Sequence, residues 1–396
     1  MTISISNPIR VLQVFGVLNR VGGAEKWILD LFHQHDPRLR FDFLLSLDDG
    51  NLVQEIRQLG STVYRVPFSK SPLPCTWGNP YLSGVRNILR NGGYDAVHVH
   101  QFDLSGEILR IAAQEQVSVR VMSVHATQYE NPRFYRRLVH HAFGRPWIFR
   151  YATDILPCSQ AVAESFAPPH PKSPTPTPQI LYTGIDPTVF EEASRRRDET
   201  GKRLRRELNL PDQAIVLGHI GRFTQQKNHR FLIELLEPLF QQDHSLYAVL
   251  VGHGEQWESI RRVVQKKQLQ DRLLLTGYRS DVPDLLCSLF DVFLLPSLYE
   301  GLPIAAIEAL AAGLGVVYSD RISHEPDNFF PQRVRRLALE TPKKDWIRAI
   351  REMLAVRCET SSALEELATT PLTLHASLEH LIRIYCKSSG KWGVGS

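Results

Sequence analysis

The stretch VFLLPSLYEGLPIAAIEALAAGLGVVYSD, residues 292–320, decides the fold. It begins with a short apolar strand, 292–296, followed by a loop and then by an almost wholly apolar helix that starts at Pro303 and ends at Gly313. A second apolar strand, 315–320, follows. Two strands without polar faces, joined by a buried helix, are typical of a βαβ unit in a parallel sheet.

The same alternation of strand and helix extends outward through the chain. Further strand-like runs, separated by helical patterns, are 11–18, 41–47, 62–68, 96–100, 119–125, 154–159, 214–221, 246–252 and 273–277. A length of 396 residues suits two domains of this kind. We therefore predict an α/β fold with two doubly wound, Rossmann-like parallel-sheet domains that face each other across a cleft.

The boundary between the domains is predicted from a change in composition. A last strand-like run of the first half, 179–186, is followed by the charged stretch 191–207. This order places the hinge near 186–200. It divides the chain into an N-terminal domain, 1–190, and a C-terminal domain, 191–371.

Composition and charge exclude several classes of protein. The formal net charge is only +4, so nucleic acid is not an expected partner. Five scattered cysteines, without CxxC or Cys/His spacing, argue against a disulfide framework and a structural zinc site. The N-terminus lacks a signal-peptide pattern, and no run approaches the roughly 20 apolar residues that span a bilayer. We expect a cytoplasmic protein that can also contact the inner face of the membrane.

Two loops after strands carry groups suited to binding an anion. After the first strand, Gly22 and Gly23 open a helix, so the backbone and the helix N–H groups can approach a phosphate. A plain tight turn is the alternative. After strand 214–221, Arg222 and Lys227 can neutralise a diphosphate without a metal. A solvated charged loop is the alternative there.

The third group of candidate residues surrounds the apolar helix after Pro303. Glu308 is the only ionisable residue of this helix, and a lone buried carboxylate is costly unless it is hydrogen-bonded. The hydroxyls of a sugar or ribose would supply the donors, whereas an ion pair with an arginine is the alternative. Glu300 lies just before the helix, beside its anion-binding amides.

These motifs, in this order, resemble the family 4 glycosyltransferases of the GT-B fold, the retaining class that builds bacterial polysaccharides and glycolipids. The resemblance covers nearly the whole chain, and residues 319–325 resemble an exopolysaccharide subgroup. It includes GGAE (22–25), DAVHVHQF (95–102), SVH (123–125), LPCSQAV (156–162), YTGID (182–186), GRFTQQKN (221–228), LVGHGE (250–255), LLLTGYRSDV (273–282) and the Glu-x7-Glu spacing from Glu300 to Glu308.

The resemblance implies a catalytic or donor-binding role for each matching residue. Gly22 and Gly23 border the diphosphate and the acceptor side, and Arg222 and Lys227 hold the diphosphate. His125 hydrogen-bonds the transferred hexose, although a core histidine is the alternative.

Further donor-binding roles follow from the same resemblance. Glu300 contacts the sugar hydroxyls beside two backbone amides, and Glu308 binds the ribose. Two later glycines let the backbone approach the nucleotide, and a Tyr-Arg pair flanks the base. The residues concerned, besides these two acids, are Gly252, Gly254, Tyr278, Arg279, Gly301 and Leu302.

The implied mechanism is a front-face, retaining substitution without a cofactor. The chain contains no Asp-x-Asp motif, so no metal is expected and Arg222 and Lys227 neutralise the charge of the leaving group. The departing phosphate oxygen helps to deprotonate the acceptor hydroxyl. The resemblance also implies that the terminal helix, 372–396, returns to the first domain.

Segment 132–150 is basic and aromatic and contains no acidic residue. This composition suits contact with an anionic membrane or a lipid-diphosphate acceptor. The alternative is a solvated basic helix whose aromatic side chains belong to the core.

We predict a glycosyltransferase that uses a nucleoside-diphosphate sugar, in the first place a UDP-sugar. The acceptor would be a saccharide or a lipid-linked molecule in bacterial surface polysaccharide or glycoconjugate assembly. A nucleotide-sugar epimerase on the same scaffold and a non-catalytic GT-B scaffold protein are the alternatives.

Overall fold

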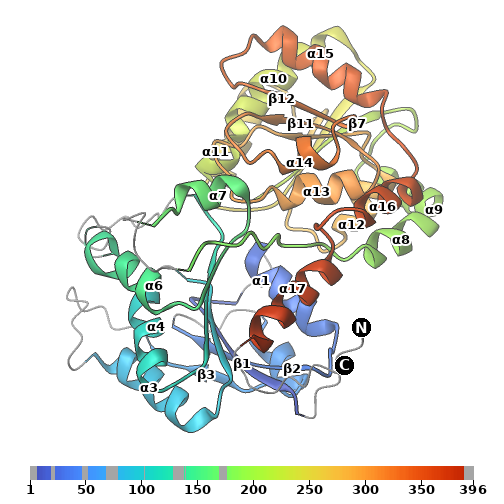
Figure 1. Ribbon diagram of the computed structural model, residues 1–396. Helices are drawn as coiled ribbons and strands as arrows, with labels where there is room; N and C mark the ends of the chain where they lie inside the picture. Colours follow the sequence, from blue (N-terminus) through green and yellow to red (C-terminus); the bar gives the residue numbers. More distant parts are fainter. Residues whose placement is uncertain are drawn as a thin grey trace. The chain divides into compact units, whose positions relative to one another are not determined.

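The structure is a computed structural model that describes residues 7–18, 23–46, 52–67, 79–101, 103–127, 138, 140–168 and 176–387. The chain forms two compact units (Figure 1). Unit 1 comprises Met1–Thr183 and Leu374–Ser396, and unit 2 comprises Gly184–Thr373.

Unit 1 contains a parallel sheet. Its strands are β1 (Ile9–Phe15), β2 (Leu39–Leu45), β3 (Val63–Arg65), β4 (Ala96–Val99), β5 (Val119–Val124) and β6 (Asp154–Pro157). Their order is β3-β2-β1-β4-β5-β6, and every pairing is parallel. The order runs outward in both directions from the β1/β4 pair, which makes the sheet doubly wound.

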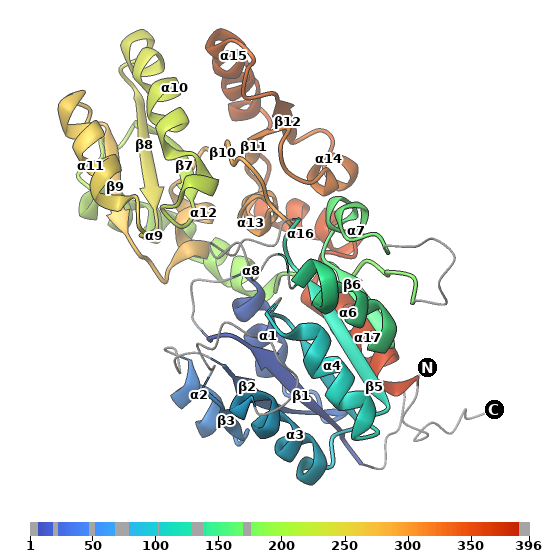
Figure 2. The ribbon, with the colours of Figure 1, turned by 90° about the vertical axis from the view of Figure 1, so that its left-hand side faces the viewer.

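Helices cover both faces of this sheet. They are α1 (Gly23–His33), α2 (Val53–Gln58), α3 (Pro80–Gly92), α4 (Ser105–Gln114), η1 (His140–Gly144), α6 (Arg145–Tyr151), α7 (Gln160–Ser165) and α17 (Leu374–Cys386). Within unit 1, α3, α4 and α6 lie on one side of the strands and α1 and α17 on the other (Figures 1 and 2). Trp27 of α1, Phe43 of β2 and Leu381 of α17 belong to one buried apolar cluster, so the C-terminal helix is part of the unit 1 core.

Unit 2 repeats this architecture. Its strands are β7 (Ile215–Ile220), β8 (Leu246–Val251), β9 (Leu273–Gly277), β10 (Val292–Leu295), β11 (Gly315–Ser319) and β12 (Val334–Leu337). Their order is β12-β11-β10-β7-β8-β9, again with parallel pairings only. Read from the β9 edge, this is the order of unit 1. The predicted fold class, two Rossmann-like domains in tandem, is therefore confirmed.

The helices of unit 2 also form two layers. They are α8 (Thr188–Arg195), α9 (Arg197–Glu207), η2 (Gln225–Lys227), α10 (His229–Gln242), α11 (Trp257–Lys266), α12 (Val282–Ser288), α13 (Ile304–Ala311), α14 (Glu325–Phe329), α15 (Lys343–Leu354) and α16 (Thr360–Ala368). Figure 1 shows α10 and α15 on one side of the unit 2 sheet and α12 and α13 on the other. Helix α13 is almost wholly buried, as its apolar sequence predicts.

The C-terminal end of α13 shows why this helix stops where it does. Gly313 has φ +89°, a left-handed conformation that favours glycine, and a Cβ there would lie 2.3 Å from the carbonyl oxygen of Cys358. The guanidinium of Arg333, a buried residue, donates to the carbonyl oxygen of Leu310 at 2.5 Å. This bond satisfies one of the carbonyl groups that a helix end leaves free.

The strand predicted over 179–186 is wrong. Two of its backbone N–H groups reach the edge strand β6: Gln179 donates to Ile155, and Leu181 donates to Pro157. Ile185 then forms an isolated bridge with Thr373. Two donors are too few for a ladder, so this run of β-favouring residues forms no strand.

The charged stretch 191–207, predicted to begin the C-terminal domain beside the hinge, forms most of the helices α8 and α9 of unit 2. Opposite charges one helical turn apart support them, with Glu191 2.6 Å from Arg195 and Arg203 3.5 Å from Glu207. Leu204 anchors α9, since it is fully buried. The change from one unit to the other lies at 183/184.

In the part of the chain that the structure describes, no helix combines the length and the apolar character needed to cross a membrane.

Candidate active site

Two loops of unit 2 follow adjacent strands and are joined by hydrogen bonds. Strands β7 and β10 are neighbours, so the loops after them leave the same edge of the sheet. The amide of Leu298 donates to the carbonyl oxygen of Gln226 at 2.7 Å, and the Gln226 side chain donates to the carbonyl oxygen of Tyr299 at 2.9 Å. Asn228 also donates to the carbonyl oxygen of Pro296 at 3.2 Å. The two loops therefore form one supported surface.

On this surface the structure brings Lys227 and Glu300 together. The ammonium of Lys227 lies 2.5 Å from a carboxylate oxygen of Glu300, and the side chains are only 15% and 10% exposed. Gln226 donates to the other oxygen of this carboxylate at 3.3 Å. Both residues were predicted for the site, but the ion pair between them was not. Arg222 is exposed, and its guanidinium has no ion-pair partner among the described residues.

The loop after β10 also presents backbone donors. The N–H groups of Gly301 and Leu302 make no hydrogen bond to any described residue. Pro303, predicted as the first helical residue, is instead the residue before α13. Free N–H groups at the start of a helix attract anions. Glu308 is buried further along the same helix, 8% exposed.

Buried polar atoms without a partner lie in and below these loops. In the described part of the chain they include Thr224 Oγ1, Ser297 Oγ, His219 Nε2 and both ring nitrogens of His229. Burial lowers the pKa of His219 to about 3 and that of His229 to about 2, with the Lys227 charge contributing in each case. Such unsatisfied groups are rare and call for a functional explanation. Sequence reasoning missed them, although His219 interrupts an otherwise apolar strand.

Gly252 and Gly254 support the Arg222 loop from below. Gly252 has φ +132°, and a Cβ there would lie 2.0 Å from the Gly221 carbonyl oxygen. At Gly254 it would lie 2.5 Å from the Phe223 carbonyl oxygen. These contacts within the protein already require glycine. The predicted approach to a nucleotide remains a prediction.

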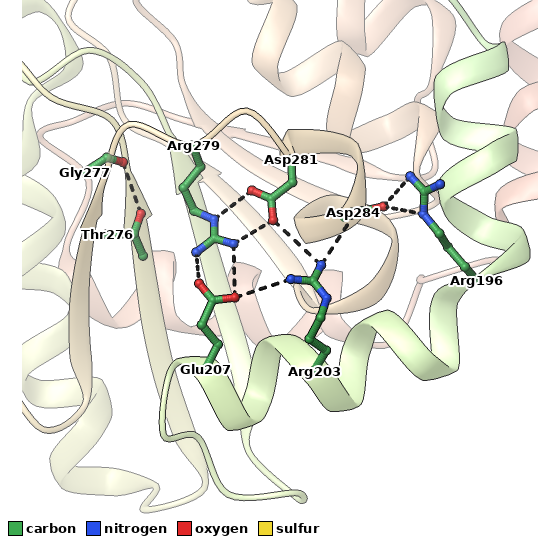
Figure 3. A network of polar contacts seen from close by, with 8 residues as sticks. All are labelled: Arg196, Arg203, Glu207, Thr276, Gly277, Arg279, Asp281 and Asp284. Atoms are coloured by element: carbon green, nitrogen blue, oxygen red, sulfur yellow. Dashed lines mark hydrogen bonds and ion pairs between the residues drawn. The ribbon is translucent and has the colours of Figure 1, made fainter.

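Arg279 is engaged in a network of ion pairs (Figure 3). Its guanidinium lies 2.5 Å from Glu207 of α9 and 2.6 Å from Asp281. The hydrogen bonds to Asp281 and Glu207 raise the pKa of Arg279, and Arg279 lowers the pKa of Asp281. The guanidinium therefore ties this loop to α9, whereas Tyr278 beside it is 53% exposed. That the pair flanks the base stays a prediction.

In unit 1, His125 follows β5 and contacts a second histidine. Its Nε2 lies 3.1 Å from Nδ1 of His100, and its ring meets the edge of Trp27 with centroids 6.2 Å apart. Burial lowers the pKa of His125 to about 4, so the imidazole is neutral at pH 7. His98 and His100 were missed as site residues, although they interrupt an apolar strand at alternate positions.

The remaining predicted elements of unit 1 are only partly described. Gly23 begins α1, and Gly22 lies outside the described residues. Of segment 132–150, residues 132–137 and 139 also lie outside them. In the described remainder Leu138 and Phe143 are each 54% exposed.

Among the described residues, no group of three or more His, Cys, Asp or Glu side chains is placed to hold a metal ion.

Two family models match the chain, one in each unit. A model described as glycosyl transferase 4-like domain matches residues 22–171, and one described as glycosyl transferases group 1 matches residues 201–369. A Bacillus subtilis (strain 168) protein named as the glycosyltransferase EpsF is 30% identical over 386 residues, 96% of this chain and 97% of that protein.

Other relatives and solved structures agree. An Escherichia coli UDP-Gal:alpha-D-GlcNAc-diphosphoundecaprenol alpha-1,3-galactosyltransferase is 30% identical over 253 residues, 60% of this chain and 61% of that enzyme. The crystal structure of Anabaena Alr3699/HepE in complex with UDP and glucose aligns with a TM-score of 0.74 at 18% identity, over 96% of this chain and 100% of that one. WaaG, a glycosyltransferase involved in lipopolysaccharide biosynthesis, aligns with a TM-score of 0.71 at 17% identity, over 96% and 100%.

The fold and the comparisons define a class: glycosyltransferases with two Rossmann-like domains, the GT-B fold. This chain belongs to the group 1, family 4-like glycosyltransferases.

Proposed function

We propose that the chain is a retaining hexosyltransferase that uses a UDP-sugar and glycosylates a saccharide or lipid-linked acceptor in bacterial surface polysaccharide or glycoconjugate assembly. The observation that carries this proposal is the Lys227–Glu300 pair, 2.5 Å apart at the sheet edge of unit 2. A cation suits a phosphate oxygen, and a carboxylate beside it suits a sugar hydroxyl. The UDP-Gal and diphosphoundecaprenol in the name of the Escherichia coli relative, and the UDP and glucose bound to HepE, also support it.

In this proposal the protein acts mainly through charge and position. Arg222, Lys227 and the amides of Gly301 and Leu302 stabilise the negative charge that develops on the departing diphosphate. Glu300 accepts hydrogen bonds from the sugar hydroxyls. The acceptor oxygen forms its bond to the anomeric carbon on the face from which the diphosphate leaves, and its proton passes to a phosphate oxygen.

Two further residues complete the donor contacts in the proposal. Glu308 binds the ribose hydroxyls, which would stabilise its buried carboxylate. His125 of unit 1 hydrogen-bonds a hydroxyl of the transferred sugar.

The stereochemistry of the product tests the proposed mechanism. Purified protein is incubated with α-linked UDP-hexoses and candidate acceptors, and the anomeric coupling of the product is measured by proton NMR. We expect an α-linked product and no reaction of the sugar without an acceptor. A β-linkage would contradict retention, and a free epimerised sugar formed without an acceptor would favour an epimerase.

We also propose that segment 132–150 contacts anionic membrane. Two apolar side chains, Leu138 and Phe143, are each 54% exposed within this basic segment, which supports the idea. The test is sedimentation with vesicles that contain anionic lipid.

We expect the variant with Arg133, Arg136 and Arg137 changed to Ser to sediment less than the unchanged protein. The matched control changes three exposed arginines of unit 2 to Ser, which alters the net charge equally: Arg195, Arg261 and Arg348. If both variants lost vesicle binding equally, the effect would come from net charge alone, and segment 132–150 would not be a specific membrane-binding surface.

A further inference from the structure

His125 is one end of a chain of hydrogen bonds that runs through the core of unit 1. Its Nε2 lies 3.1 Å from Nδ1 of His100. On the other side of that ring, Nε2 of His100 lies 2.8 Å from the side-chain oxygen of Gln13. His100 also stacks on Phe15, with ring centroids 4.2 Å apart, so the orientation of its ring is held by packing as well.

The chain continues from Gln13 to the C-terminal helix. The amide nitrogen of Gln13 donates to the hydroxyl of Tyr385 on α17, at 3.4 Å. That hydroxyl lies 2.6 Å from Nδ1 of His98, and Nε2 of His98 lies 2.7 Å from the hydroxyl of Ser123. Gln13, His98 and Tyr385 are completely buried.

The amide of Gln13 determines which atom of each partner carries a hydrogen. Its oxygen can only accept, so Nε2 of His100 must donate. Neutral His100 then has an unprotonated Nδ1, which accepts a hydrogen bond from Nε2–H of His125. Nδ1 of His125 is left as an acceptor, and no described residue donates to it.

The hydrogen bonds on the other side of Gln13, which run to Tyr385 and His98, also have a fixed donor and acceptor. The Gln13 amide nitrogen can only donate, so the Tyr385 hydroxyl accepts from it and donates to Nδ1 of His98. His98 then donates from Nε2 to Ser123. Every imidazole must be neutral for this pattern, and burial lowers the pKa of His98, His100 and His125.

We propose that Gln13, His100 and Tyr385 are positioning residues that hold His125 in its Nε2–H tautomer, so that Nδ1 accepts a hydrogen bond from a hydroxyl of the transferred sugar. The contact with the sugar rests on the function proposed above. A core that needed only packing would gain from apolar residues at these positions, because a buried polar network must satisfy every member. The network instead makes one defined acceptor on His125.

The first test needs no variant. Long-range proton–nitrogen NMR of the histidine rings in the full-length protein reports the tautomer of each ring at pH 7. We expect the Nε2–H tautomer for His98, His100 and His125. An Nδ1–H tautomer of His125, or a protonated ring, would overturn the proposal.

The second test reverses the direction of the chain. Gln13→Glu keeps the shape of the side chain but replaces a donor with an acceptor, and the new carboxylate favours a second proton on His100. His100 would then donate from Nδ1, and His125 would shift to its Nδ1–H tautomer. We expect kcat to fall by about tenfold, the loss of one hydrogen bond to the sugar, with little change in the KM for the donor.

The matched control for this variant is Gln114→Glu. Gln114 lies on the exposed side of α4, where its side chain accepts from Arg86 at 2.6 Å. We expect this variant to keep the wild-type tautomers and kcat. If Gln13→Glu also kept them, the proposed positioning role would be wrong. If the tautomers were as expected but His125→Ala transferred sugar at the full rate, the sugar contact and the proposed function of His125 would fail, while the tautomer assignment would stand.

Discussion

Units 1 and 2 have the same strand order, but the polar residues that they place near the corresponding sheet edge differ in charge. In unit 1 they are neutral: Gln13 on β1, His100 after β4 and His125 after β5 form a directed hydrogen-bond chain. In unit 2 the loops after β7 and β10 hold an ion pair, Lys227–Glu300. One scaffold thus carries two kinds of polar arrangement. A chain of neutral hydrogen-bonding groups can discriminate between donors and acceptors of a ligand. An ion pair instead exerts a strong electric field on a charged ligand.

The Lys227–Glu300 ion pair of unit 2 should matter most for turnover. We expect Lys227→Ala and Glu300→Gln each to lower kcat by about 100-fold or more, because each removes a partner of a charge that forms in the transition state. Initial rates of sugar transfer at a saturating concentration of the nucleotide-sugar donor measure kcat for each variant.

Lys267→Ala is the matched control for the lysine variant. Lys267 forms an ion pair of the same length with Glu237, 2.5 Å, in unit 2, where the two side chains are 32% and 33% exposed. Its loss should leave kcat unchanged. Comparable rates for the Lys227 and Lys267 variants would contradict a catalytic role for the Lys227–Glu300 ion pair.

Changes in the neutral hydrogen-bond chain of unit 1 should have a smaller effect on turnover. We expect His125→Ala to lower kcat about tenfold, since one uncharged hydrogen bond is lost. With a pKa of about 4, His125 stays neutral from pH 6 to 8, so this ratio of rates should not change across that range. A ratio that changed with pH near 6.5 would show that the ring titrates in solution-like surroundings.

Both units should lose stability in acid for a shared reason. Buried histidines with lowered pKa values bind protons only after unfolding, so the free energy of unfolding falls as the pH drops below 6.5. Each such group contributes at most about 1.4 kcal/mol per pH unit until its folded pKa is reached. His229 isolates one contribution, because its pKa is about 2 and neither ring nitrogen has a partner among the described residues.

Urea unfolding at pH 7 and pH 5 measures the slope. We expect His229→Phe to reduce the loss between these values, and His35→Asn, at an exposed position with left-handed backbone, to leave it unchanged. Equal slopes for the His229 variant and the unchanged protein would mean that this ring takes up protons equally in the native and unfolded states.

The smallest effect is expected from chelation. In the proposed mechanism Arg222 and Lys227 supply the positive charge that the diphosphate needs, so transfer should continue at an unchanged rate in EDTA. Rates measured with and without added magnesium or manganese decide this, and a complete loss that either metal restores would contradict the metal-free mechanism.

The fold was predictable because its determinants are local. Runs such as 292–296 and 315–320 are apolar on both faces, and that pattern alone predicts a buried parallel strand. Strand β12 was missed because Arg335 and Arg336 are exposed at the sheet edge, which breaks the apolar run. The run 179–186 has the pattern of a strand but too few partners. Strand pairing depends on which segments lie beside a run in the folded protein, and the residues of the run alone do not specify those neighbours.

The site was predictable only in its parts. Arg222, Lys227 and Glu300 lie in the connections that follow β7 and β10, and parallel strands bring such connections to one edge. The 2.5 Å contact between Lys227 and Glu300 depends on how the two loops fold, which spacing does not reveal. The histidine chain was harder still, because Tyr385 lies 287 residues from His98 in sequence.

Helix α17 gives unit 1 an unusual order of assembly. Its buried side chains Leu381 and Tyr385 belong to the core of the unit that is synthesised first, yet all of unit 2, Gly184–Thr373, is made before them. Domains fold as units during synthesis. Unit 2 can therefore close on itself while unit 1 still exposes the apolar surface that α17 covers. Since Tyr385 also belongs to the hydrogen-bond chain that ends at His125, this histidine acquires its final hydrogen bonding only when this last helix docks.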